Sequence, residues 1–224
     1  EFHAAVESES YEDASRMIAD LDPYSVGGLV PSANDGDLLV SVATAIRSAM
    51  ARDRQLANLM NADYTPLGKL RVRQAAAAGD EAAVQLATVQ FHGTEAAGMA
   101  HRWLGDRALA AGEFVAAVDH FNRAAKHVGV LEKAEIAPRV RLAAAMLGAD
   151  VGEPQTAGVT FGDVKMTAQQ FESLVAEMRQ VNAGSAAQLE EFTGQSVKAA
   201  PQPSGFQVHK RGRLDGEAGE WARG

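Results

Sequence analysis

The chain has 224 residues, of which 46% are hydrophobic and 6% aromatic, and its formal net charge is −8. This length can bury a substantial core, and a hydrophobic fraction dominated by alanine favours close-packed helices over a β-sandwich. The excess of 29 acidic over 21 basic residues argues against a nucleic-acid partner, and the lack of cysteine excludes disulfides and thiolate metal sites.

The N-terminal region is expected to be helical, with one long loop. Apolar residues at three- and four-residue steps predict a helix over 11–21. The stretch 24–37 is rich in Gly, Pro, Asn and Asp, which is typical of a loop. Asp37 is then a natural cap for a helix over 38–50, where apolar residues follow one stripe.

Two antiparallel helix pairs are predicted in the middle of the chain. Thr65 ahead of Pro66 indicates a helix start, because a hydroxyl caps the turn and proline tolerates the first helical position. Gly79 and Gly112 are expected to end helices in the left-handed conformation. The predicted helices are 66–78, 81–91, 95–111 and 114–127.

Another helix is expected over 132–147, with Pro138 in or near its first turn. Alternation around a Gly-Asp turn predicts a small β-hairpin over 159–166. Thr167 then caps the helix that follows. No apolar run approaches the roughly 20 residues that span a bilayer, so no transmembrane segment is expected.

A short helical piece over 186–192 is predicted to precede a tail, 193–224, that is rich in Gly, Pro and charge. This composition predicts an extended or disordered tail, and it divides the chain into a helical domain, 1–192, and the tail. Phe206 and Trp221 are spaced apolar residues of the tail and are candidate anchors for a partner. A plain linker is the alternative interpretation of the tail.

The middle of the chain has a repeat-like spacing. Gly79 and Gly112 are 33 residues apart, close to the roughly 34-residue period of tetratricopeptide units. In residues 98–127 the small and large residues stand at the offsets of that repeat, namely Leu104, Gly105, Gly112, Phe114, Ala117, Phe121 and Ala124. This unit resembles a tetratricopeptide repeat, whereas the unit before it is degenerate. The fold predicted is therefore all-α, with antiparallel helix pairs of a TPR-like solenoid, a small β-hairpin and an extended C-terminal tail.

A broader likeness covers residues 35–180, through the order of the helices, the motifs Phe91–Thr94 and Leu104–Asp106, and the hairpin and helix over 159–171. Together these look like the helical region that precedes a PQQ-binding-like β-propeller in large exported bacterial proteins. The resemblance implies a periplasmic or cell-envelope location. Propeller blade motifs are absent from the sequence, so it implies no quinone cofactor. Because the chain starts without methionine, we interpret it as a processed or excised piece of a longer product.

No catalytic or cofactor-binding motif is recognised, since the sequence contains no nucleophile elbow, phosphate loop or dinucleotide fingerprint. His120 and His127 share a helix face but lie about two turns, roughly 10 Å, apart, which is too far for one metal ion without other ligands. His92 and His101 are interpreted as loop and helix-surface residues. We therefore expect no enzyme activity, no cofactor and no metal.

The function expected is that of a non-catalytic scaffold that docks a protein segment or subunit. Carried over from the repeat, the residues that face its groove are Met99, Arg102, Trp103 and Asp106. Arg71 and Arg73 extend this surface. Two alternatives remain, an architectural subunit of a larger assembly held by its tail and broad surfaces, and a helical-bundle enzyme without a recognisable motif.

Overall fold

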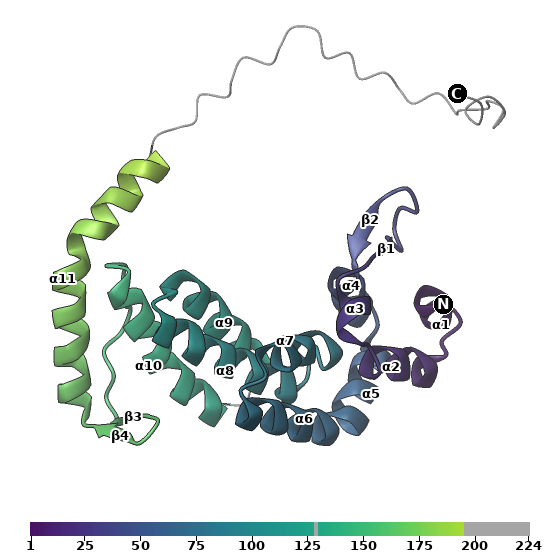
Figure 1. Cartoon of the computed structure of the whole chain (residues 1–224), viewed down its shortest axis with the longest axis horizontal. Coiled ribbons are helices and arrows are strands. Elements are labelled where there is room, and N and C mark those ends of the chain that lie inside the picture. Colours follow the sequence, from purple (N-terminus) through teal and green to yellow (C-terminus); the bar gives the residue numbers. More distant parts are fainter. Residues whose placement is uncertain (128–129, 195–224) are drawn as a thin grey trace, which may run out of the picture. The chain divides into compact units, whose positions relative to one another are not determined.

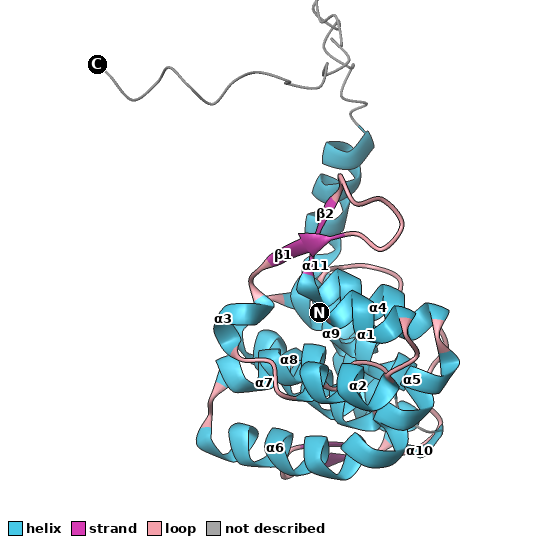
Figure 2. Cartoon of the chain, turned by 90° about the vertical axis from the view of Figure 1, so that its right-hand side faces the viewer, coloured by secondary structure: helices cyan, strands magenta, loops and turns pink. Residues whose placement is uncertain are grey.

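The computed structural model describes residues 1–127 and 130–194. It is mostly helical, at 71%, with two small antiparallel hairpins, which confirms the helical class (Figure 2). By its contacts the chain divides into Glu1–Ala187 and Gln188–Gly224, and the core and the sites described below lie in the first unit. No described helix is long and apolar enough to cross a bilayer.

The elements follow one another along the chain and are labelled in Figure 1. The helices are α1 (Phe2–Glu7), α2 (Tyr11–Ala19), α3 (Pro23–Val26), α4 (Val42–Arg52), α5 (Arg54–Leu59), the π-helical turn η1 (Met60–Tyr64), α6 (Thr65–Ala78), α7 (Glu81–Gln90), α8 (Glu95–Ala111), α9 (Phe114–His127), α10 (Val130–Met146) and α11 (Ala168–Gly194). The strands are β1 (Leu29–Pro31), β2 (Leu39–Ser41), β3 (Val159–Phe161) and β4 (Val164–Met166).

The predicted helix over 38–50 begins too early. Residues Leu39–Ser41 form β2, which pairs antiparallel with β1, so that Val40 lies opposite Val30. Ser41, rather than Asp37, caps α4, because its Oγ accepts the backbone N–H of Thr44 at 3.2 Å. The turn residues between the strands therefore close a hairpin, in place of the open loop that their composition predicts.

Helix α6 begins within one residue of the predicted start, but the Thr65 hydroxyl does not cap it, so the predicted cap is wrong. Helices α5 and α6 run into each other through η1, and Tyr64 keeps helical dihedrals, with φ −104° and ψ −13°. A π-helical turn holds one more residue than an α-helical turn, so it rotates the residues that follow it. Tyr64 packs against the apolar clusters on both sides of this turn.

The central helix pairs form as predicted. Gly79 and Gly112 both take the left-handed conformation, with φ of +68° and +80°, and end α6 and α8. The Asp80 carboxylate caps α7 by accepting the backbone N–H of Ala83 at 3.0 Å. Within the α8–α9 pair, Phe121 lies directly over Gly105, where the absence of a side chain makes room for its ring. Local signals therefore set both the ends of these helices and their close approach.

Two predictions for the C-terminal half are wrong. Pro138 lies inside α10 instead of in its first turn, so the carbonyl of Ala134 loses its intrahelical N–H partner. Helix α11 is continuous to Gly194, without a break before residue 186. The β3–β4 hairpin is confirmed, and Thr167 caps α11 by accepting the N–H of Gln170.

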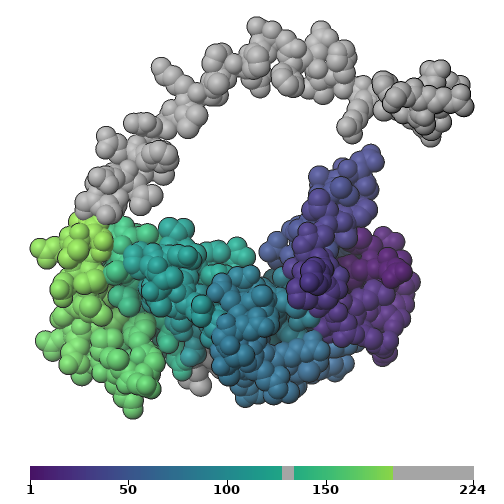
Figure 3. Space-filling view, viewed as in Figure 1, coloured from purple at the N-terminus to yellow at the C-terminus, as the bar shows by residue number. Residues whose placement is uncertain are grey.

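The core consists of four apolar clusters that succeed one another along the chain. The first is built around Ile18 and Leu56, the second around Phe91, the third around Phe121 and the fourth around Phe171. In the space-filling view the colours of Glu1–Ala187 likewise succeed one another in chain order (Figure 3). Val89 of α7 also packs against the first cluster, so the clusters are built mainly, but not entirely, from neighbouring elements. Such succession is typical of stacked helical arrays.

Candidate functional site

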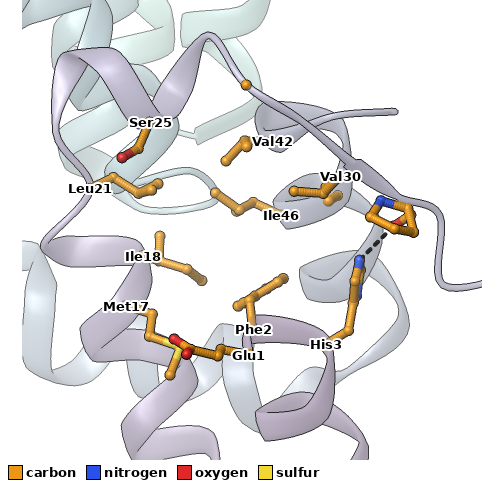
Figure 4. A pocket seen from close by; sticks show the side chains of 13 residues that line it. Glu1, Phe2, His3, Met17, Ile18, Leu21, Ser25, Val30, Val42 and Ile46 are labelled. Atoms are coloured by element: carbon orange, nitrogen blue, oxygen red, sulfur yellow. Dashed lines mark hydrogen bonds between the residues drawn. The ribbon is translucent and has the colours of Figure 1, made fainter. Parts of the chain in front are cut away.

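An apolar cavity of about 460 Å³ lies between α1, α2, β1 and α4. Figure 4 shows the side chains of Phe2, Ile18 and Ile46 directed into it. At its edge, the Nε2 atom of His3 lies 2.9 Å from the carbonyl oxygen of Pro31. The lining can accept an apolar group, but it contains no cluster of titratable groups suited to catalysis.

The four predicted groove residues all lie on α8, and each is partly buried. Met99 and Trp103 pack against the second apolar cluster. The guanidinium of Arg107 covers the Trp103 ring at 5.0 Å from its centroid, a distance at which cation and ring attract each other. Met99 and Trp103 therefore use part of their surface in contacts within the protein.

Arg102 and Asp106 form ion pairs with α10. Arg102 contacts Glu135 at 2.6 Å, and Asp106 accepts a hydrogen bond from Arg139 at 2.8 Å. In both pairs the partners are 33 residues apart in sequence. Arg102 and Glu135 remain well exposed, at 39% and 59% of their side-chain surface, so this pair is open to exchange with another charged group.

The remaining predicted residues are scattered. Arg71 donates a hydrogen bond to the carbonyl oxygen of Ala19 at 2.8 Å, which ties α6 to the N-terminal helices. Arg73 is exposed on α6. Phe206 and Trp221 lie outside the described residues, so their role as anchors stays a prediction.

A cluster of four histidines lies between the end of α7, α8 and α9. The Nδ1 atoms of His101 and His120 are 3.2 Å apart, which is within hydrogen-bond range. The His92 and His127 rings meet edge to face with centroids 5.2 Å apart, and His127 lies nearly parallel to His101 at 6.3 Å. The prediction that His101 is a surface residue is wrong, because only 6% of it is exposed.

Burial keeps these imidazoles neutral. It lowers the pKa of His92 to about 4 and that of His101 to about 3, and it is also the main cause of the lowered pKa values of His120 and His127. Nearby positive charge adds to the effect. Arg47 further lowers the pKa of His92. The other imidazoles further lower the pKa of His101.

We expect the free energy of unfolding to decrease by on the order of 2 kcal/mol between pH 7.5 and pH 5, which is about half of what the two pKa shifts would give without screening by solvent. An unfolded histidine has a pKa near 6.5, above the folded values of about 4 for His92 and about 3 for His101. In this range the unfolded chain binds more protons, so acidification favours unfolding. Urea denaturation at the two pH values measures the change. The double variant H92Q/H101Q should show a smaller loss, and an unchanged pH dependence would contradict the assignment.

The histidine cluster is not arranged as a metal site. Within residues 1–127 and 130–194, no group of three or more His, Cys, Asp or Glu side chains could hold a metal ion. Sequence reasoning compared only His120 with His127 and missed the cluster. The cluster could have been predicted by pairing the two helices of the 98–127 unit side by side, because this pairing places His101 opposite His120.

Comparison of the sequence with protein-family models and with curated proteins, and of the structure with solved structures, finds no match.

Proposed function

We propose that α6–α10 form a tetratricopeptide-like stack that binds a protein segment along the exposed face of α6 and α8. The proposal concerns a non-catalytic scaffold, and the resemblance of the sequence suggests the cell envelope as its location. The partner expected is an amphipathic segment with apolar anchors and at least one acidic side chain.

The ion pairs between α8 and α10 are the main support for this proposal. Two pairs, Arg102 with Glu135 and Asp106 with Arg139, join residues 33 positions apart. A separation of one repeat length is the relation expected when corresponding helices of successive hairpins lie side by side. Lys69 and Glu95 form a further ion pair, between α6 and α8, which does not have this repeat spacing.

Exposed apolar side chains on α6 supply the anchoring surface. Leu67 and Leu70 are 38% and 47% exposed, although leucine is among the residues most often buried. Leu70 stands 33 residues before Trp103, so the two occupy corresponding positions of their hairpins. Arg73 and Arg102 add positive charge that an acidic side chain of the partner would neutralise.

The test uses peptides selected from a random display library on the whole chain, with affinities measured by fluorescence anisotropy. Replacing Leu70 with glutamate should weaken binding at least tenfold, because it removes an apolar contact and introduces a charge that repels an acidic partner. Val115→Glu on α9 is the matched control. Val115 is 68% exposed, and the same substitution there should leave affinity unchanged.

Equal binding by the two variants would contradict the proposed surface, provided that both melt like the parent chain. Truncation after Phe192 tests the alternative of an architectural subunit. If the truncated chain melts normally but loses all selected peptides, the tail carries the interaction instead of α6 and α8.

A further inference from the structure

A second cavity, of about 580 Å³, is lined by residues of α4, α7 and α9 and by three of the four clustered histidines, which are His92, His101 and His127. Its volume lies within the range of about 300–1,000 Å³ that is usual for small-molecule sites. Ala43 and Val89 contribute apolar wall, whereas the remaining lining is mostly polar and basic. The cavity is therefore large enough for a small organic molecule and has both apolar and polar walls.

The charges that line this cavity are unbalanced. Arg47 of α4 and Arg123 and Lys126 of α9 supply three cations, while Asp119 is the one carboxylate among the lining residues. Asp119 is already paired with Arg123 at 2.9 Å. Arg47 donates a hydrogen bond to the Thr44 hydroxyl. Because the hydroxyl is neutral, this contact does not balance the charge of the guanidinium. A positive cavity in a chain of net charge −8 marks a local concentration of basic groups.

Neutral imidazoles complete the polar lining. His92, His101 and His127 border the cavity, and each neutral ring offers one N–H donor. Arg47 lowers the pKa of His92, and Lys126 lowers that of His127, so both imidazoles experience the positive field. The positive charge of these basic residues disfavours binding of a divalent cation. A bound anion would neutralise that charge.

We propose that this cavity binds a small phosphate-bearing organic anion, held by the side chains of Arg47 and Lys126 and by imidazole N–H groups of His92 and His127. Guanidinium and ammonium groups form charge-assisted hydrogen bonds to phosphate oxygens. The apolar wall formed by Ala43 and Val89 accommodates the organic part. This site is separate from the proposed peptide surface on α6 and α8, so either can be wrong without the other.

Isothermal titration calorimetry with inorganic pyrophosphate at constant ionic strength tests the phosphate subsite. We expect saturable 1:1 binding by the full chain and at least tenfold weaker binding by R47Q/K126Q. The matched control is R16Q/R52Q, which removes the same charge from residues that do not line this cavity. That control should bind as tightly as the parent chain, and both variants are checked for folding by thermal melting.

Three results would overturn the proposal. Equal weakening in both double variants would show that overall charge, instead of the cavity, sets the affinity. Tighter binding of citrate than of pyrophosphate would assign the site to carboxylates. Stoichiometric zinc binding that is lost in H92Q/H127Q would identify the cluster as a cation site.

Discussion

Arg141→Ala is expected to lower the free energy of unfolding by about 3 kcal/mol, because it removes a buried guanidinium and leaves a half-buried carboxylate oxygen and several carbonyls without their partner. The Arg141 side chain is 7% exposed, and one of its terminal nitrogens contacts Glu172 at 2.6 Å. The other lies within hydrogen-bond distance of the backbone carbonyl oxygens of Val151, Gly152 and Glu153, which share its two N–H groups. A single guanidinium thus joins α10, the loop that follows it and α11.

Chemical denaturation measures this loss, with Arg179→Ala as the control. Arg179 is an exposed residue of α11, so its removal should change stability by no more than about 0.5 kcal/mol. The double variant R141M/E172L should lose less than Arg141→Ala, because it removes the guanidinium and its carboxylate partner together. A midpoint for Arg141→Ala equal to that of the control would show that the guanidinium does not hold this region.

Gly105→Val is expected to cost about 3 kcal/mol, since it forces a branched side chain into a filled space. A Cβ atom at Gly105 would lie 2.6 Å from a ring carbon of Phe121, closer than real Cβ contacts allow. Phe121 is fully buried in the third apolar cluster and has little room to move. The α8–α9 pair would have to separate, which a lower melting temperature detects.

Compensation within the pair provides the sharper experiment. In a background of Phe121→Leu, the Gly105 substitution should cost clearly less, because the shorter side chain leaves space for the new one. Gly36→Val is the control, since a Cβ atom at Gly36 would have no neighbour within 4 Å. Strictly additive losses at the two positions would mean that the glycine is not required by the ring.

Helix ends were predictable where the signal is local. Gly79 and Gly112 end their helices through their own left-handed dihedrals. Asp80 caps the next helix by accepting a backbone N–H three residues further on. Both signals depend only on residues close by in the sequence. The choice between Asp37 and Ser41 as a cap was different. It depended on whether the intervening residues pair with Leu29–Pro31, a non-local contact that helical periodicity does not reveal.

The interior of α10 shows a second limit of sequence reasoning. A proline normally marks a helix start or end, yet Pro138 is kept inside α10, where tertiary contacts close to it hold the helix. Arg139, the next residue, bonds to Asp106 and lies over the Phe161 ring at 5.1 Å. Local propensity predicts the cost of the proline but not the contacts that offset it.

The candidate sites were predictable to different degrees. Repeat register placed Arg102 and Asp106 on one helix, but it could not show that α10 supplies their ion-pair partners. The basic cavity was not predicted, because Arg47 belongs to a helix far from His127 in the sequence. Its charge balance emerges only when the fold brings these residues together.

The π-helical turn at Met60–Tyr64 links the rotational register of α5 to that of α6. Leu56 and Met60 belong to the first apolar cluster, whereas Val72 belongs to the second, and one uninterrupted helical rod carries all three. Deleting a single residue within the turn would rotate everything beyond it by about 100°. Either apolar stripe could then face its own core, but not both at once. The turn therefore sets the rotational register between α5 and α6, and with it the side chains that each helix presents to its own core.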